Sequence, residues 1–151
     1  MDRTSLYESD FYAWTQRQSE LIALQEWSRI DAANVIEELE SLGRKERQEL
    51  RNRLGILLGH LLKWQFQPDR RSNSWRGTIR EQRKQINLLL KDSPSLKPYL
   101  QEALQDAYEL GAALAVKETQ LSEGVFPQSC PYLLRDVLEP DFFPQTGLSE
   151  H

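Results

Sequence analysis

The stretch LGILLGHLL, from Leu54 to Leu62, is the longest uncharged apolar run in the chain and decides the fold. Its nine residues cover only about half of a bilayer, so the run is too short for a membrane helix. It continues a leucine stripe that begins at Leu50, and from Leu54 onward apolar residues fall on nearly every side of a helix. A helix of this kind normally lies buried at the centre of a protein. We therefore expect a central helix over residues 44–66, ending before Pro68.

The sequence on either side of this helix predicts more helices and no sheet. The chain contains 24 Leu against 6 Ile and 4 Val, a composition that favours helices over strands. Apolar residues at i, i+3 and i+4 predict further helices over about 10–24, 31–42, 74–91 and 94–123. Gly43 is expected to end the second of these or to mark a bend, and Gly124 to end the last.

The C-terminal segment differs from the helices before it. Four of the seven prolines fall within the last 25 residues, where they alternate with aromatic residues. This composition predicts an irregular wrap around the bundle, with one short helix near residues 131–138. The expected fold is all-α: a single-domain helical bundle of about five main helices over residues 1–144. The Pro/aromatic-rich wrap closes this domain, and residues 145–151 are expected to form a disordered tail.

Composition restricts the possible partners and compartments. Cys130 is the single cysteine, which excludes an intramolecular disulfide, and two histidines leave too few ligands for a zinc finger. The first thirty residues carry several acids, which is untypical of a signal peptide. We therefore expect a cytoplasmic protein without a membrane partner. No phosphate-binding glycine loop or other cofactor motif occurs, so no cofactor is expected.

Charge is segregated along the chain. Residues 1–43 hold 3 basic and 9 acidic side chains, residues 44–91 hold 13 and 4, and residues 92–151 hold 3 and 10. Two interpretations follow. Either the basic helices pack beside acidic neighbours and the fold neutralises itself, or part of the basic surface stays open and binds a polyanion.

The basic segment contains the candidate residues for nucleic-acid binding. Arginines bind phosphates bidentately, and indole rings stack on single-stranded bases. Trp75 also fits the apolar stripe of its predicted helix, where it would be a core residue instead. The candidate nucleic-acid surface lies within residues 63–84 and consists of Trp64, Arg70, Arg71, Arg76, Arg80, Arg83 and Lys84, with Trp75 close by.

The acids Glu37, Glu38 and Glu40, with His60, form the candidate metal or catalytic centre. Helical carboxylates at i, i+3, such as Glu37 and Glu40, bind metals when facing helices add ligands, but the Glu-x-x-His pattern of di-iron proteins is absent. The structural alternative pairs Glu40 with Arg44 and makes His60 a buried, neutral imidazole. No nucleophile accompanies His60, so no catalytic residue is assigned and a non-enzymatic role is favoured.

Two glycines lie one turn apart on the central helix. Gly55 and Gly59 permit a close helix contact, and the matching small residues are Ala107, Gly111 and Ala115 on the fifth predicted helix. This pairing is the most specific packing prediction that the sequence supports.

Seven blocks of the sequence, in order, resemble a known family. They are YESDFYAWTQRQ at 7–18, EELESLGRKE at 37–46, HLLKWQFQP at 60–68, SWRGTIREQR at 74–83, DSPSL at 92–96, KETQL at 117–121 and FPQSCPY at 126–132. On these blocks the chain is identified as a member of the bacterial family called domain of unknown function twenty-nine, which is abundant in cyanobacteria. The resemblance implies an almost wholly α-helical domain and implies no activity.

Three functions therefore compete. The first is a helical module for protein interaction or self-association, favoured by the close-packing glycines and by an aromatic tail able to dock on a partner. The second is a nucleic-acid-binding domain using residues 63–84. The third, an enzyme or metal protein, requires the three glutamates and His60 to converge in one pocket.

Overall fold

A computed structural model describes residues 3–146, with side chains described from residue 6. The chain folds into two compact units, Met1–Lys45 and Glu46–His151, called here the N-terminal and C-terminal units. Helices are the regular structure throughout residues 3–146 and no strand occurs there, which confirms the all-α prediction. That residues 1–144 act as one domain stays a prediction, and most of the expected tail, residues 147–151, lies outside the described residues.

The central helix is longer than expected. α3 runs from Ala32 to Phe66 and contributes residues to both units. Of the two alternatives expected at Gly43, a helix end or a bend, the end is wrong because the helix continues through this residue. An interior glycine weakens a helix by about 1 kcal/mol but does not stop it. The flanking residues, Glu40 to Leu42 and Arg44 to Glu46, are mostly strong helix formers, so they outweigh this cost.

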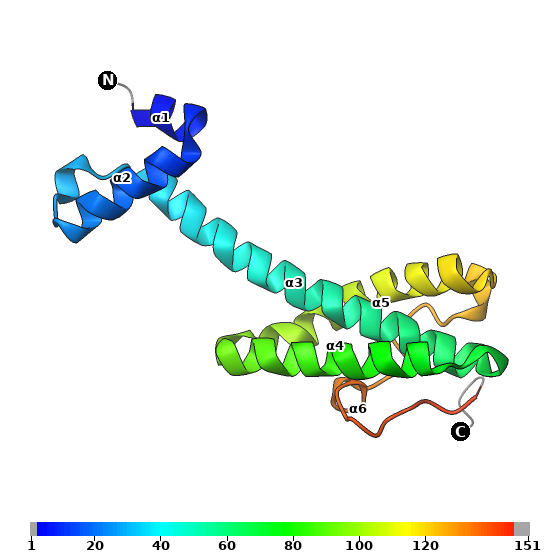
Figure 1. Ribbon diagram of the computed structural model, residues 1–151. Helices are drawn as coiled ribbons and strands as arrows, with labels where there is room; N and C mark the ends of the chain where they lie inside the picture. Colours follow the sequence, from blue (N-terminus) through cyan, green and yellow to red (C-terminus); the bar gives the residue numbers. More distant parts are fainter. Residues whose placement is uncertain (1–2, 147–151) are drawn as a thin grey trace. The chain divides into compact units, whose positions relative to one another are not determined.

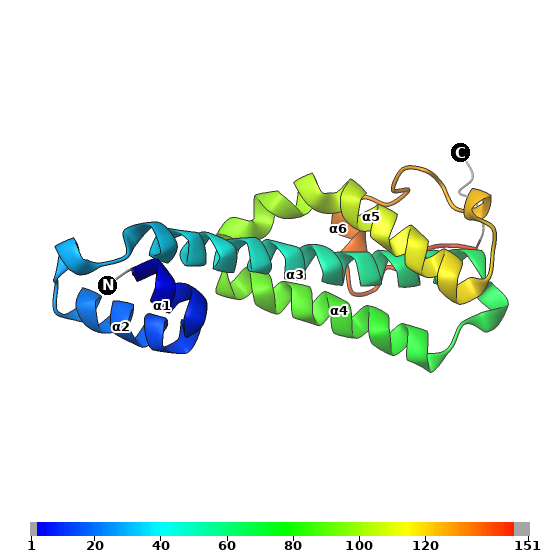
Figure 2. The same cartoon turned by 90° about the horizontal axis from the view of Figure 1, so that it is seen from above.

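The N-terminal unit contains α1 (Arg3–Ser9), α2 (Phe11–Ala23), a 3₁₀ turn η1 (Trp27–Arg29) and the beginning of α3 (Figures 1 and 2). Asp10 caps α2 by accepting a hydrogen bond from the backbone nitrogen of Ala13 at 3.1 Å. Asp31, just before α3, accepts hydrogen bonds from Trp14 at 3.1 Å and Asn34 at 2.9 Å. These contacts fix the reversal between α2 and α3.

The C-terminal unit adds α4 (Asn73–Asp92), α5 (Lys97–Thr119) and the short α6 (Leu134–Val137), with 3₁₀ turns η2 (Pro68–Arg70), η3 (Pro94–Leu96) and η4 (Glu123–Val125). Figures 1 and 2 both show the C-terminal half of α3 flanked by α4 and α5. α6 confirms the short helix expected near residues 131–138. α5 ends at Thr119 because Gln120 adopts a left-handed conformation (φ 65°), so the predicted end at Gly124 is wrong.

The core of the C-terminal unit is built on the apolar run Leu54–Leu62. Leu54, Leu57, Leu58, Leu61 and Leu62 are fully buried, as expected for a central helix. The other helices and the C-terminal segment contribute Ile79, Ile86, Leu90, Leu100, Ala107, Tyr108, Ala115, Phe126, Tyr132 and Val137. The aromatic residues of the wrap therefore pack on the chain's own core.

The predicted close contact between α3 and α5 is confirmed. A Cβ atom added to Gly111 would lie 2.6 Å from the carbonyl oxygen of Gly55 and 2.7 Å from the backbone nitrogen of Gly59. A Cβ added to Gly59 would lie 2.8 Å from the carbonyl oxygen of Gly111. The two helix backbones touch at these residues, and only glycine leaves room for the contact.

Candidate functional site

Arg83 belongs to the interior and not to the predicted nucleic-acid surface. Its side chain is only 3 % exposed. The guanidinium donates hydrogen bonds to the carbonyl oxygens of Val137 at 2.8 Å, Pro140 at 3.1 Å and Phe142 at 2.7 Å. Burial lowers the pKa of Arg83 to about 10. Arg83 thus anchors the C-terminal wrap to α4 and is not available to an external phosphate.

The expected stacking platform is also part of the packing. Trp64 is buried, and its ring lies 4.9 Å from that of Phe143, centroid to centroid. The guanidinium carbons of Arg71 and Arg76 lie 4.8 and 4.9 Å from the centre of the Trp64 ring. Arg71 also donates to the carbonyl of Trp64 at 2.8 Å. Trp64 therefore offers no free face to a base, and Arg71 and Arg76 act within the chain.

Trp75, the second predicted platform, lies against Lys63. The Lys63 nitrogen is 4.6 Å from the centre of the Trp75 ring and 2.6 Å from a carboxylate oxygen of Glu118. Lys63 is buried and Glu118 partly exposed, and this hydrogen bond lowers the pKa of Glu118. The acidic flanks therefore neutralise part of the basic segment, which also forms ion pairs with them through Arg44 and Arg47.

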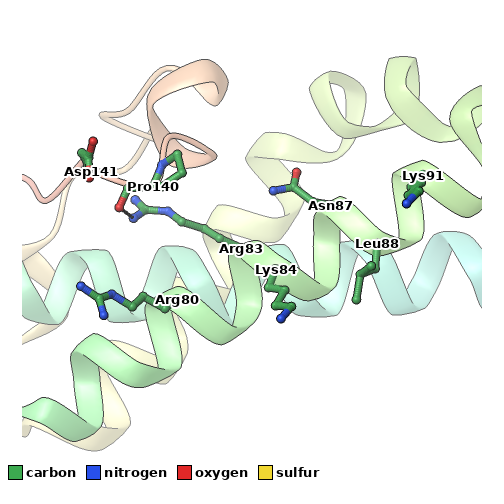
Figure 3. Close-up of a pocket in the computed structure, with 8 residues that line it drawn as sticks. All are labelled: Arg80, Arg83, Lys84, Asn87, Leu88, Lys91, Pro140 and Asp141. Carbon is green, nitrogen blue, oxygen red and sulfur yellow. Dashed lines mark hydrogen bonds between the residues drawn. The ribbon is translucent and has the colours of Figure 1, made fainter.

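Other cations of the basic segment have no such partner. Arg70, Arg80, Lys84 and Lys91 are exposed, and none forms an ion pair with an acid of residues 6–146. Three of them line a groove of about 500 Å³ on the outside of α4 (Figure 3). This α4 groove is formed by Arg80, Arg83, Lys84, Asn87, Leu88, Lys91, Pro140 and Asp141. In Figure 3, Arg83 reaches toward Pro140, whereas Lys84 and Leu88 project away from it.

The residues of the candidate metal centre are not brought together. Glu37 and Glu40 lie in the N-terminal unit and His60 in the C-terminal unit, 20 or more positions along α3 from either acid. Side chains of one helix meet only at spacings of three or four. No group of three or more metal-ligating side chains occurs within the described part of the chain.

The acids have other partners instead. Glu37 forms an ion pair with Arg44 at 2.8 Å, whereas the sequence had suggested Glu40 as the partner of Arg44. Glu38 accepts a hydrogen bond from the Tyr7 hydroxyl, which raises the pKa of Tyr7 to about 12. The Glu37–Arg44 pair lies within α3, whereas the Tyr7–Glu38 hydrogen bond ties α1 to α3 within the N-terminal unit.

His60 is buried, as the structural alternative predicted, and its Nδ1 lies 2.9 Å from the carbonyl oxygen of Ile56. Burial lowers the pKa of His60 below its ordinary value of 6.5, and the nearby charge of Lys63 acts in the same direction. The unfolded chain therefore binds a proton near pH 6.5, while the folded chain binds it only at lower pH.

The free energy of unfolding should consequently fall as the pH drops through the range below 6.5. A His60→Gln variant keeps an amide donor for Ile56 and loses this titration. Urea denaturation from about pH 7.5 to about pH 5 should show a steeper loss in the wild type than in the variant. Equal slopes would contradict a depressed pKa at His60.

The N-terminal unit exposes an unusual amount of apolar surface. Eight of the thirteen large hydrophobic side chains that are exposed in the described residues lie in this unit, although it is the smaller one. They are Phe11, Tyr12, Ile22, Leu24, Trp27, Ile36, Leu39 and Leu42. Monomeric proteins rarely expose apolar residues in such density without a binding role.

Part of this surface forms a groove between α2 and α3. The groove has a volume of about 290 Å³ and is lined by Trp14, Thr15, Gln18, Ser19, Ile22, Val35, Glu38, Leu39 and Leu42. Leu39 and Leu42 are 63 % and 60 % exposed, and Trp14 closes the floor. We call this the N-terminal groove. Its apolar residues on α3, Val35, Leu39 and Leu42, follow the i, i+4, i+7 spacing of a helix face that packs on another helix.

The comparison with known families gives a match over most of the chain. A family model described as Domain of unknown function DUF29 matches residues 6–143. The chain belongs to this family. The DUF29 match includes residues of both grooves. No curated protein and no solved structure matches the chain.

Two features of this DUF29 chain escaped the sequence analysis. Arg83 lies on the same helix stripe as Ile79 and Ile86, four and three residues away, so its spacing already indicated an inward position. The apolar faces of α2 and α3 were predicted, but periodicity does not tell what covers a face.

Among residues 3–146, no helix is long and apolar enough to cross a membrane.

Proposed function

We propose that this chain is a protein-interaction module whose docking surface is the N-terminal groove with the apolar residues around it. The observation that carries the proposal is the concentration of exposed hydrophobic side chains in the N-terminal unit. Two side chains of this surface, Leu39 and Leu42, would gain about 1 kcal/mol or more each when a partner covers them. A docked helix is the simplest cover for a face built from two helices.

Charge defines the partner. The first 43 residues carry 3 basic and 9 acidic side chains, so this unit repels acidic surfaces and a second copy of itself. A partner that matches both the apolar surface and the acidic charge of this unit is an amphipathic helix. It would have apolar residues on the docking face and lysines or arginines beside them. Electrostatic attraction would steer such a helix to the groove.

The glycines and the aromatic tail, which suggested an interaction module in the sequence, serve the chain's own packing instead. The glycines of α3 and α5 serve the chain's own helix contact. Phe126 and Tyr132 of the tail are buried in the core. Nucleic-acid binding keeps only the exposed cations Arg70, Arg80 and Lys84 in its favour, since its aromatic platform is occupied.

The test uses the full chain and a synthetic helical peptide with leucines on one face and lysines on the other. Fluorescence anisotropy should show binding to the wild type. The double substitution Leu39→Ser with Leu42→Ser should weaken binding by on the order of tenfold, because it removes apolar area from the groove.

A matched control is Leu133→Ser, which changes a comparably exposed leucine (56 %) in the C-terminal unit and should bind the peptide as the wild type does. A peptide with glutamates in place of the lysines should bind far more weakly. If the Leu39/Leu42 variant bound as tightly as the wild type, or the acidic peptide bound equally well, the proposal would be wrong.

A further inference from the structure

We infer that the α4 groove is the docking site for the N-terminal unit of a second copy of this chain. The inference rests on the proposed function, since it names the basic helix that the N-terminal groove accepts: α4 itself. The two surfaces belong to different units, so one copy can offer the first while another copy offers the second.

The charges of the two surfaces are complementary. α4 carries Arg80, Lys84 and Lys91 on its outer side, and none of them forms an ion pair with an acid of residues 6–146. The cations at both ends of this row lie about 16 Å apart along the helix. In the N-terminal unit, Glu20 and Glu40 are exposed helix residues that likewise have no basic partner within the described residues.

The apolar residues match as well. Leu88 lies between Lys84 and Lys91 in the sequence and is 44 % exposed, and Pro140 borders the same groove. An apolar side chain flanked by cations on a helix is the pattern required of the N-terminal groove's partner. The C-terminal wrap, held to α4 by Arg83, forms the other wall of the α4 groove.

These details favour a protein occupant over a nucleic acid. The backbone of a nucleic acid presents mainly charged phosphates, so it would match the cations of the groove better than it would match Leu88 and Pro140. The groove itself contains no aromatic side chain on which bases could stack. Asp141, in its wall, repels phosphate and would accept a donor from a protein partner.

The test uses complementation between two full-length variants in sedimentation experiments. One variant, Arg80→Glu with Lys84→Glu and Lys91→Glu, loses the cations of the α4 groove and keeps the N-terminal groove intact. The other variant, Leu39→Ser with Leu42→Ser, loses two apolar side chains of the N-terminal groove and keeps the α4 groove intact. Wild type should self-associate at high micromolar concentration, more weakly as salt is added. Each variant alone should be monomeric, and their mixture should form a 1:1 complex.

The inference would be overturned by a wild type that stays monomeric, by a charge variant that still self-associates, or by a mixture that forms no complex. A second charge variant with glutamines at the same three positions excludes effects of repulsion within α4. Binding of the basic peptide is measured in parallel. If the charge variants bind this peptide normally but no complementation occurs, the inference fails and the proposed function stands.

Salt-dependent binding of a DNA oligonucleotide, lost in the charge variants while wild-type protein remains monomeric, would also overturn the inference. It would assign the α4 groove to nucleic acid.

Discussion

Gly111→Ala is expected to cause the largest loss of stability among the six glycine-to-alanine changes possible in residues 3–146. The new Cβ would lie 2.6 Å from the Gly55 carbonyl oxygen and 2.7 Å from the Gly59 nitrogen. Both are backbone atoms in the buried part of α3, so relief requires α3 and α5 to move apart. Overpacking a core costs about 1–3 kcal/mol, and a backbone clash places this variant at or above the upper end. Urea denaturation measures the loss.

Gly43→Ala and Gly77→Ala are the matched controls. Each lies in a helix, and a Cβ there would contact nothing within 4 Å. Alanine should therefore stabilise these helices by about 0.5–1 kcal/mol. A Gly111→Ala variant as stable as these controls would show that α3 and α5 do not touch as described.

Arg83→Met should release the C-terminal wrap. Methionine keeps an apolar stem but provides none of the donors that reach the carbonyls of Val137, Pro140 and Phe142. Hydrogen bonds from a charged donor contribute about 1.5–3 kcal/mol each, and partial exposure of the acceptors reduces the sum. We expect a loss of about 3 kcal/mol in the free energy of unfolding, with faster proteolytic cleavage after residue 126.

Arg80→Met is the control for this change because Arg80 lies on the same helix and is exposed. It should alter stability by less than about 0.5 kcal/mol. If both substitutions left the wrap equally protected from protease, Arg83 would not be its anchor.

The helical architecture followed from the sequence because it depends on local patterns. The apolar run at Leu54–Leu62 predicted its own burial, and the small residues Gly55, Gly59 and Gly111 predicted a contact between two helices. Both features are expressed by periodicity and residue size alone. The end of a helix depends on smaller free-energy differences than the burial of its core does. The stop expected at Gly124 and the helix end considered at Gly43 were therefore wrong.

The candidate sites could not be predicted in the same way. The spacing of Arg83 indicates an inward position, but the sequence does not show what its guanidinium binds there. The partners are three carbonyls of the C-terminal wrap, 54 to 59 residues further along the chain. The apolar face containing Leu39 and Leu42 resembles a core-facing stripe in sequence. Only the structure shows that these residues are exposed within their unit.

Amide hydrogen exchange of the full chain, with and without the basic amphipathic peptide, tests the docking surface most directly. The N-terminal groove lies between α2 and the first residues of α3, so slower exchange is expected over residues 11–23 and 32–45 when the peptide is present. Exchange in α5 should not change. Protection confined to the C-terminal unit, or no protection at all, would contradict the assignment of the N-terminal unit as the docking surface.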